Sequence, residues 1–162
     1  MNDDFHKILF NYLTEAGLST TAASYLNLAI LLIVALVLAW FLDLLIWKVL
    51  RSVSLRLARK SKTNFDNFLV ANRVPRYLAH IVPLSILIEF VPFAFIGFDY
   101  AAEIVLKFLH VLFVVLALYV VKSVFTSIND YLKTKPRFRD KPMGSYIQVF
   151  MIFAWIVGIF TI

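Results

Sequence analysis

Residues 25–47 read YLNLAILLIVALVLAWFLDLLIW, and Asp43 is the one charged residue among them. At about 1.5 Å per residue, a helix of this length crosses a hydrocarbon core of roughly 30 Å. Three further apolar runs follow at 77–98, 104–125 and 146–162. The chain is 62% hydrophobic, whereas soluble domains average about 45–50%. The sequence therefore predicts an all-α, polytopic transmembrane protein with four spans.

The fourth apolar run differs from the others at its end. Residues 146–162 stay apolar to the last residue, without the polar or aromatic exit that normally follows a membrane helix. We therefore expect this last span to be truncated in the sequence. The chain has no cysteine, which excludes a disulfide framework and a thiolate metal site.

The basic residues predict an orientation for the spans. Of the 16 Lys and Arg, all but Lys7 and Lys107 lie near two connections, 48–76 and 126–145. The connection between the second and third runs carries two acids, Asp99 and Glu103, and no base. By the positive-inside rule, the N-terminus is outside and both basic connections are cytoplasmic.

The N-terminal segment, residues 1–24, is too acidic for a cleavable signal and predicts an amphipathic extracytoplasmic helix. Its apolar residues recur at helical spacing: Phe5, Ile8, Leu9, Tyr12 and Leu13. Such a helix lies flat on the outer interface or packs on another subunit. The sequence leaves both placements open.

Ionisable residues inside the spans need partners, because a charge at membrane depth is unfavourable. Depth along antiparallel helices favours a pair of Glu89 with Lys107 or His110. Asp43 is expected to pair with Lys122 if the first and third spans touch. Snorkelling or protonation of the carboxyl groups is the alternative. The three histidines are scattered and no catalytic motif occurs, so we expect no enzyme, no catalytic residue, no metal and no cofactor.

The connection 48–76 has a structure of its own. The first span continues as a basic helix until the apolar pattern breaks at Thr63–Asn64, and Thr63-x-x-Asp66 is a capping-box-like start of a second helix. This predicts an elbow on the inner surface, packed through Phe65, Asp66, Phe68 and Leu69. Its basic side chains are expected to contact anionic lipid: Arg51, Arg56, Arg59, Lys60, Lys62, Arg73 and Arg76.

Three stretches of the chain carry a family resemblance. KSKTNFDNFL (60–69), VPRYLAHIVP (74–83) and KPMGSYIQVF (141–150) resemble the transmembrane region of small-conductance mechanosensitive (MscS-like) channels, in the branch with five transmembrane helices. The resemblance spans residues 45–155. It implies a bacterial inner-membrane protein that assembles as a homo-oligomer, a heptamer in this family. The placement of the basic residues favours anionic membrane lipid as a partner and no nucleic acid.

The Gly/Ala-rich pore helix and the soluble domain of that family have no counterpart in the sequence. The resemblance therefore implies the peripheral, tension-sensing part of a channel that opens on membrane stretch to relieve osmotic pressure. Two alternatives stay open: a non-conducting accessory or scaffolding membrane protein, and a fragment of a transporter.

Overall fold

The computed structural model describes residues 2–60, 64–136 and 143–161, and every regular element in these ranges is a helix. In chain order they are α1 (Asn2–Glu15), α2 (Thr20–Lys60), α3 (Phe65–Ala71), α4 (Val74–Ala94), α5 (Asp99–Lys133) and α6 (Met143–Thr161). The predicted all-α class is therefore confirmed.

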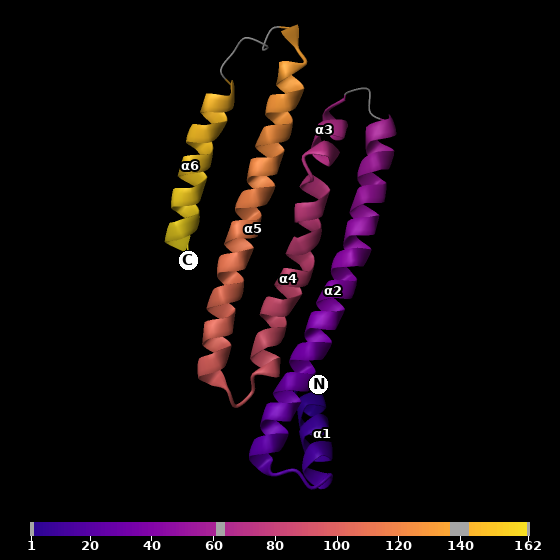
Figure 1. Ribbon diagram of the computed structural model, residues 1–162, viewed down its shortest axis with the longest axis vertical. Coiled ribbons are helices and arrows are strands. Elements are labelled where there is room, and N and C mark those ends of the chain that lie inside the picture. Colours follow the sequence, from indigo (N-terminus) through magenta and orange to yellow (C-terminus); the bar gives the residue numbers. More distant parts are fainter. Residues whose placement is uncertain (1, 61–63, 137–142, 162) are drawn as a thin grey trace.

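The four long helices lie side by side in the order α2, α4, α5, α6, with neighbours antiparallel (Figure 1). A single layer leaves each helix open on two faces. Leu36, Trp40 and Phe160 are accordingly 60%, 64% and 86% exposed. So much exposed apolar surface suits lipid as the surrounding solvent rather than water.

Three of the helices are long and apolar enough to cross a membrane: residues 20–56 of α2, α4 and α5. They indicate a multi-pass membrane protein. The apolar part of α6, Gly144–Phe160, is shorter. The fourth span and the orientation of the chain stay predictions.

The ends of the helices differ from the ends of the apolar runs in the sequence. The first run and its basic continuation form one helix, α2, which begins at Thr20 and reaches Lys60. α4 ends at Ala94 instead of continuing to Phe98, because the chain turns at Gly97, whose φ is +85°. This left-handed conformation favours glycine. α5 then runs to Lys133, beyond the end of its apolar run at Phe125.

The most enclosed packing joins α2 to α4 near the α4–α5 turn. Leu31 is 2% exposed and lies in one cluster with Val91, Ala94 and Phe95. α1 folds back against α2 beside this cluster, to which it contributes Leu9. Only part of the predicted apolar face of α1 is buried. Leu13 is buried, whereas Ile8 and Tyr12 remain 64% and 70% exposed.

A glycine sets the distance between α5 and α6. A Cβ atom at Gly158 would lie 2.9 Å from Cδ1 of Leu118 and 3.2 Å from Cγ1 of Val114. Small residues allow close approach of helix backbones in membrane proteins. Toward the other end of α6, the rings of Phe125 and Phe150 pack with centroids 4.4 Å apart.

Candidate anion-binding site at the elbow

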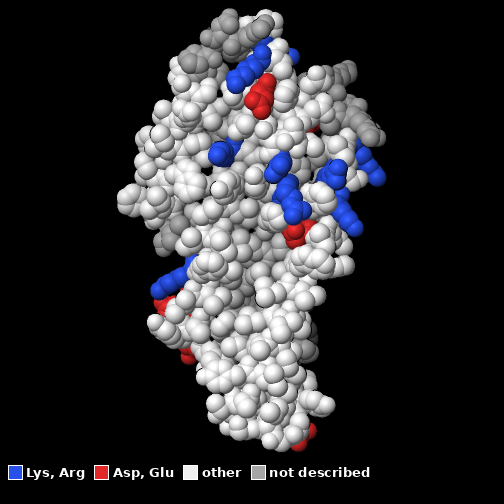
Figure 2. Space-filling view, viewed as in Figure 1, with Lys and Arg blue, Asp and Glu red and all other residues white. Residues whose placement is uncertain are grey.

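Positive charge gathers in the half of the molecule that carries α3. Figure 2 shows most of the Lys and Arg side chains of this face in that half, above a largely uncharged surface. The α2 part of this group is Lys48, Arg51 and Arg56, and the junction of α3 with α4 adds Arg73 and Arg76. This end of the molecule is therefore the one that would attract anions.

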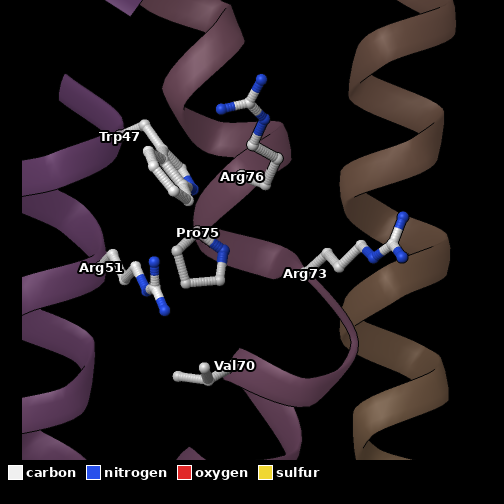
Figure 3. Close-up of a pocket in the computed structure, with 6 residues that line it drawn as sticks. All are labelled: Trp47, Arg51, Val70, Arg73, Pro75 and Arg76. Carbon is white, nitrogen blue, oxygen red and sulfur yellow. The ribbon is translucent and has the colours of Figure 1, made fainter. Parts of the chain in front are cut away.

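A hollow of about 370 Å³ opens where α2, α3 and α4 meet (Figure 3). Each of the three helices or their junctions contributes to its lining, which consists of Trp47, Arg51, Val70, Arg73, Pro75 and Arg76. The hollow thus combines an apolar floor with guanidinium groups, and it depends on all three elements.

Trp47 lies between two of these arginines. Its ring centroid is 5.2 Å from Cζ of Arg51 and 5.1 Å from Cζ of Arg76, both within cation–π range. The side chain of Arg73 extends the other way in Figure 3, toward α5. Guanidinium groups are planar, permanently charged forks that match phosphate and carboxylate. Both guanidinium groups can therefore contribute positive charge to the hollow beside Trp47.

The junction before α4 positions Arg76. Arg73 has a φ of +62°, in the left-handed region that non-glycine residues rarely adopt. α4 starts directly after it, with Pro75 in its first turn, where the missing N–H of proline leaves no bond unmade. The backbone N–H of Arg76 donates to the carbonyl of Arg73 at 3.0 Å. The tight turn faces Arg76 toward α2.

Asp43 belongs to the same surface and corrects one predicted pair. Its Oδ1 lies 2.5 Å from Nδ1 of His80, and its Oδ2 lies 3.8 Å from a guanidinium nitrogen of Arg76. The predicted pairing with Lys122 does not form. α4 stands between α2 and α5, and the backbones of those two helices do not approach each other closely within the described ranges. Lys122 instead lines a smaller hollow with Tyr77 and Tyr119.

The predicted pair at the opposite end is also replaced. Nζ of Lys107 lies 2.7 Å from Oε1 of Glu103, one turn away on the same helix. Nδ1 of His110 lies 2.7 Å from the carbonyl oxygen of Leu106. Glu89 is exposed and makes no ion pair in the part of the chain that the structure describes. Glu103 lies four residues before Lys107 on the same helix, so the two can pair without any contact between helices. This pair therefore forms in place of one between Lys107 and Glu89.

The short helix α3 is held against α5 through small polar residues. Oγ of Ser127 donates to the carbonyl of Phe68 at 3.1 Å, and Oγ of Ser123 donates to the carbonyl of Asn72. Nδ2 of Asn72 donates to Oδ2 of Asp130 at 3.0 Å. Carbonyls at the end of a helix lack intrahelical partners. Ser123 supplies a partner for the carbonyl of Asn72, whereas the carbonyl of Phe68 also accepts from the backbone N–H of Asn72 at 2.9 Å. Both serines join α3 to α5.

Aromatic packing covers the other side of this contact. The rings of Phe65 and Phe68 meet Tyr131 of α5 with centroids 5.5 Å and 6.4 Å away. Leu69 is half-buried, and Asp66 lies in the first turn of α3, where negative charge is favourable. Asn64 is the N-cap residue and makes no side-chain capping bond. Thr63, the predicted cap, lies outside the described residues.

The predicted lipid-contacting residues fall into three groups. Arg51, Arg73 and Arg76 line one hollow, and Arg56 is exposed on α2. Lys62 and the side chains of Arg59 and Lys60 lie outside the described part of the chain.

Two members of the site, Trp47 and His80, were not predicted from the sequence, although their spacing carries a signal. Residues 43, 47 and 51 recur every four positions along α2, as do residues 76 and 80 along α4. Residues at this spacing share one face of a helix.

The geometry provides a site for an anion with an apolar neighbour. In the described ranges, no group of three or more His, Asp or Glu side chains could hold a metal ion. The chain matches no family model, and no curated protein and no solved structure is significantly similar to it.

Proposed function

We propose that this chain is the lipid-facing, tension-sensing transmembrane region of a mechanosensitive channel of the MscS-like family. Such a channel opens on membrane stretch to relieve osmotic pressure. The observation that carries the proposal is the elbow, where an arginine-flanked tryptophan lines a hollow between three helices at the basic end of an otherwise apolar layer. The three stretches that resemble this family add to it.

A tension sensor must contact lipid differently in its closed and open states, since a stimulus shifts an equilibrium only through such a difference. The single layer of helices exposes apolar side chains on two faces. Tilting α2 would change how much of this surface lies in the hydrocarbon. The chain therefore has the kind of surface on which tension can act.

The elbow offers a route for passing that motion along the layer. α3 contacts α2, α4 and α5, while the backbones of α2 and α5 do not approach each other closely in the described part of the chain. At the basic end, a displacement of α2 thus reaches α5 through α3 or α4. Arginines that hold a lipid headgroup beside Trp47 would keep this end of α2 at the membrane surface.

The proposal includes three further features: cytoplasmic placement of the elbow in a bacterial inner membrane, assembly as a homo-oligomer, and anionic lipid as the partner of the arginines. The second candidate is a non-conducting accessory or scaffolding protein. The exposed surface of α6 favours it, because Phe153 and Phe160 are 65% and 86% exposed and would suit a protein partner as well as lipid.

Survival after osmotic downshock tests the proposal. The natural full-length protein, expressed in bacteria that lack their own stretch-activated channels, is expected to rescue cells moved from high to low osmolarity. Double charge reversal, Arg51→Glu with Arg76→Glu, is expected to reduce the rescue, because both guanidinium groups on Trp47 become carboxylates. Membrane insertion of each protein is checked by fractionation. A correctly inserted wild-type protein that rescues no cells would favour the accessory function.

A further inference from the structure

The carboxylate of Asp43 is shared by two cations of α4 that differ in kind. Oδ1 lies 2.5 Å from His80, and Oδ2 lies 3.8 Å from Arg76. A guanidinium group is always charged. An imidazole ordinarily gains its charge between about pH 8 and pH 5. Asp43 therefore has one permanent partner and one partner that depends on pH.

Arg76 is shared in turn between Asp43 and the hollow. Its Cζ lies 5.1 Å from the ring of Trp47, while its nearest approach to Asp43 is longer than a hydrogen bond. Asp43 thus holds Arg76 by charge alone. The side chain of Asp43 is only 15% exposed, so water screens its charge poorly. A second cation at Asp43 will therefore change what Arg76 offers to an anion in the hollow.

We propose that protonation of His80 releases Arg76 from Asp43 to the phosphodiester of an anionic lipid in the hollow beside Trp47, so that this lipid binds more tightly as the pH falls. The inference rests on the lipid contact in the proposed function. The sign follows from the formal charges of Asp43, Arg76 and His80. With neutral imidazole the three charges cancel, and with protonated imidazole the group carries one net positive charge.

The charged groups on the surrounding elements do not compete for this role. α2 adds Arg51, and α5 faces α4 with Tyr119 and Lys122 around Tyr77. The titratable residue of α3 is Asp66, and α1 contacts α4 far from the elbow, near the α4–α5 turn. Aspartate, tyrosine, lysine and arginine side chains ordinarily keep one protonation state across neutral pH. Histidine is the residue type that gains or loses a proton in this range.

A phospholipid fits the hollow better than a soluble phosphate does. The lining of the hollow contains the apolar side chains of Trp47, Val70 and Pro75 beside the arginines. These side chains offer apolar surface for acyl chains next to the guanidinium groups. A free phosphate ion would use only the arginines. The ligand class is therefore a lipid whose headgroup is a phosphodiester with net negative charge.

Trp47 itself can report on this lipid. The chain has three tryptophans, and Trp40 and Trp155 are exposed. Replacing both with phenylalanine leaves Trp47 as the one indole. In phosphatidylcholine nanodiscs, titration with brominated phosphatidylglycerol then quenches Trp47 as the lipid binds. We expect its binding constant, relative to brominated phosphatidylcholine, to rise about fivefold between pH 8 and pH 6, the factor that one added positive charge contributes at an anionic surface.

Variants assign the rise to the proposed groups. His80→Asn should abolish it, and Asp43→Asn should give tight binding at both pH values, because Arg76 is then free throughout. The control is His110→Asn. The ring of His110 contacts a carbonyl of its own helix, α5, so the rise should persist. Circular dichroism checks the helix content of each variant, and His80→Gln replaces His80→Asn if the latter does not fold.

A wild-type binding constant that stays level with pH would overturn the inference, as would a rise that survives in His80→Asn. Displacement of brominated phosphatidylglycerol by inorganic phosphate would overturn its assignment to a lipid. The assay needs no ion current. The inference therefore stands if the protein fails the downshock test but its binding constant for phosphatidylglycerol still rises as the pH falls. A binding constant without preference for phosphatidylglycerol at either pH would contradict the lipid contact on which both proposals rest.

Discussion

Replacing Leu31 with alanine is expected to lower the free energy of unfolding by roughly 2–5 kcal/mol. Leu31 is the largest fully buried side chain of the described residues, at 2% exposure, and it packs with Val91, Ala94 and Phe95 between α2 and α4. In lipid the hydrophobic effect contributes little to helix association, so packing contacts dominate. The cavity left by the substitution loses those contacts outright. Unfolding of the protein in mixed micelles measures the change.

The same substitution at Leu36 provides the control. Leu36 lies on α2 as well, but it is 60% exposed and faces the surrounding solvent. Leu36→Ala is expected to change the free energy of unfolding by less than about 0.5 kcal/mol. Equal losses at the two positions would contradict the packing of α4 on this face of α2.

Replacing Ser127 with leucine is expected to detach α3 from α5, at a cost of about 2–4 kcal/mol. Ser127 is fully buried, and its hydroxyl bonds the carbonyls of Phe68 and Ser123. A leucine side chain exceeds the available space and removes the hydroxyl that bonds Phe68. The chain has no cysteine of its own. Spin labels on cysteines introduced at Asn67 and Lys133 can therefore report the distance between α3 and α5.

Thr126→Leu is the matched control for this variant. Thr126 precedes Ser127 on α5, and its hydroxyl bonds the carbonyl of Lys122 on its own helix at 2.9 Å. The distance between the spin labels should stay unchanged in Thr126→Leu and become longer and broader in Ser127→Leu. An unchanged distance in Ser127→Leu would show that Ser127 does not hold α3 against α5.

Hydropathy predicts the helices of this protein because membrane length and composition constrain them strongly. It does not predict which helices touch. The expected pair of Asp43 with Lys122 required contact between the first and third spans, but α4 lies between α2 and α5 and supplies His80 and Arg76 instead. The order of helices in a layer depends on packing at many positions, so the hydrophobic periodicity of one helix does not predict it.

The candidate site was also only partly predictable from the sequence. The basic residues of the connection 48–76 were evident from composition, but their grouping around Trp47 depends on the left-handed turn at Arg73. A non-glycine residue gives no local signal for that conformation. Ser123 and Ser127 were equally hard to interpret, because a serine in an apolar helix can also bond a carbonyl of its own helix. Only the approach of α3 reveals their second role.

We propose that this helical layer senses tension in the lipid around it. Patch recording from liposomes that contain only the purified natural full-length protein tests it most directly. We predict currents that appear as suction stretches the patch, with a threshold shifted in Ser127→Leu and retained in Thr126→Leu. Patches that contain folded protein and stay silent until the membrane ruptures would contradict the account.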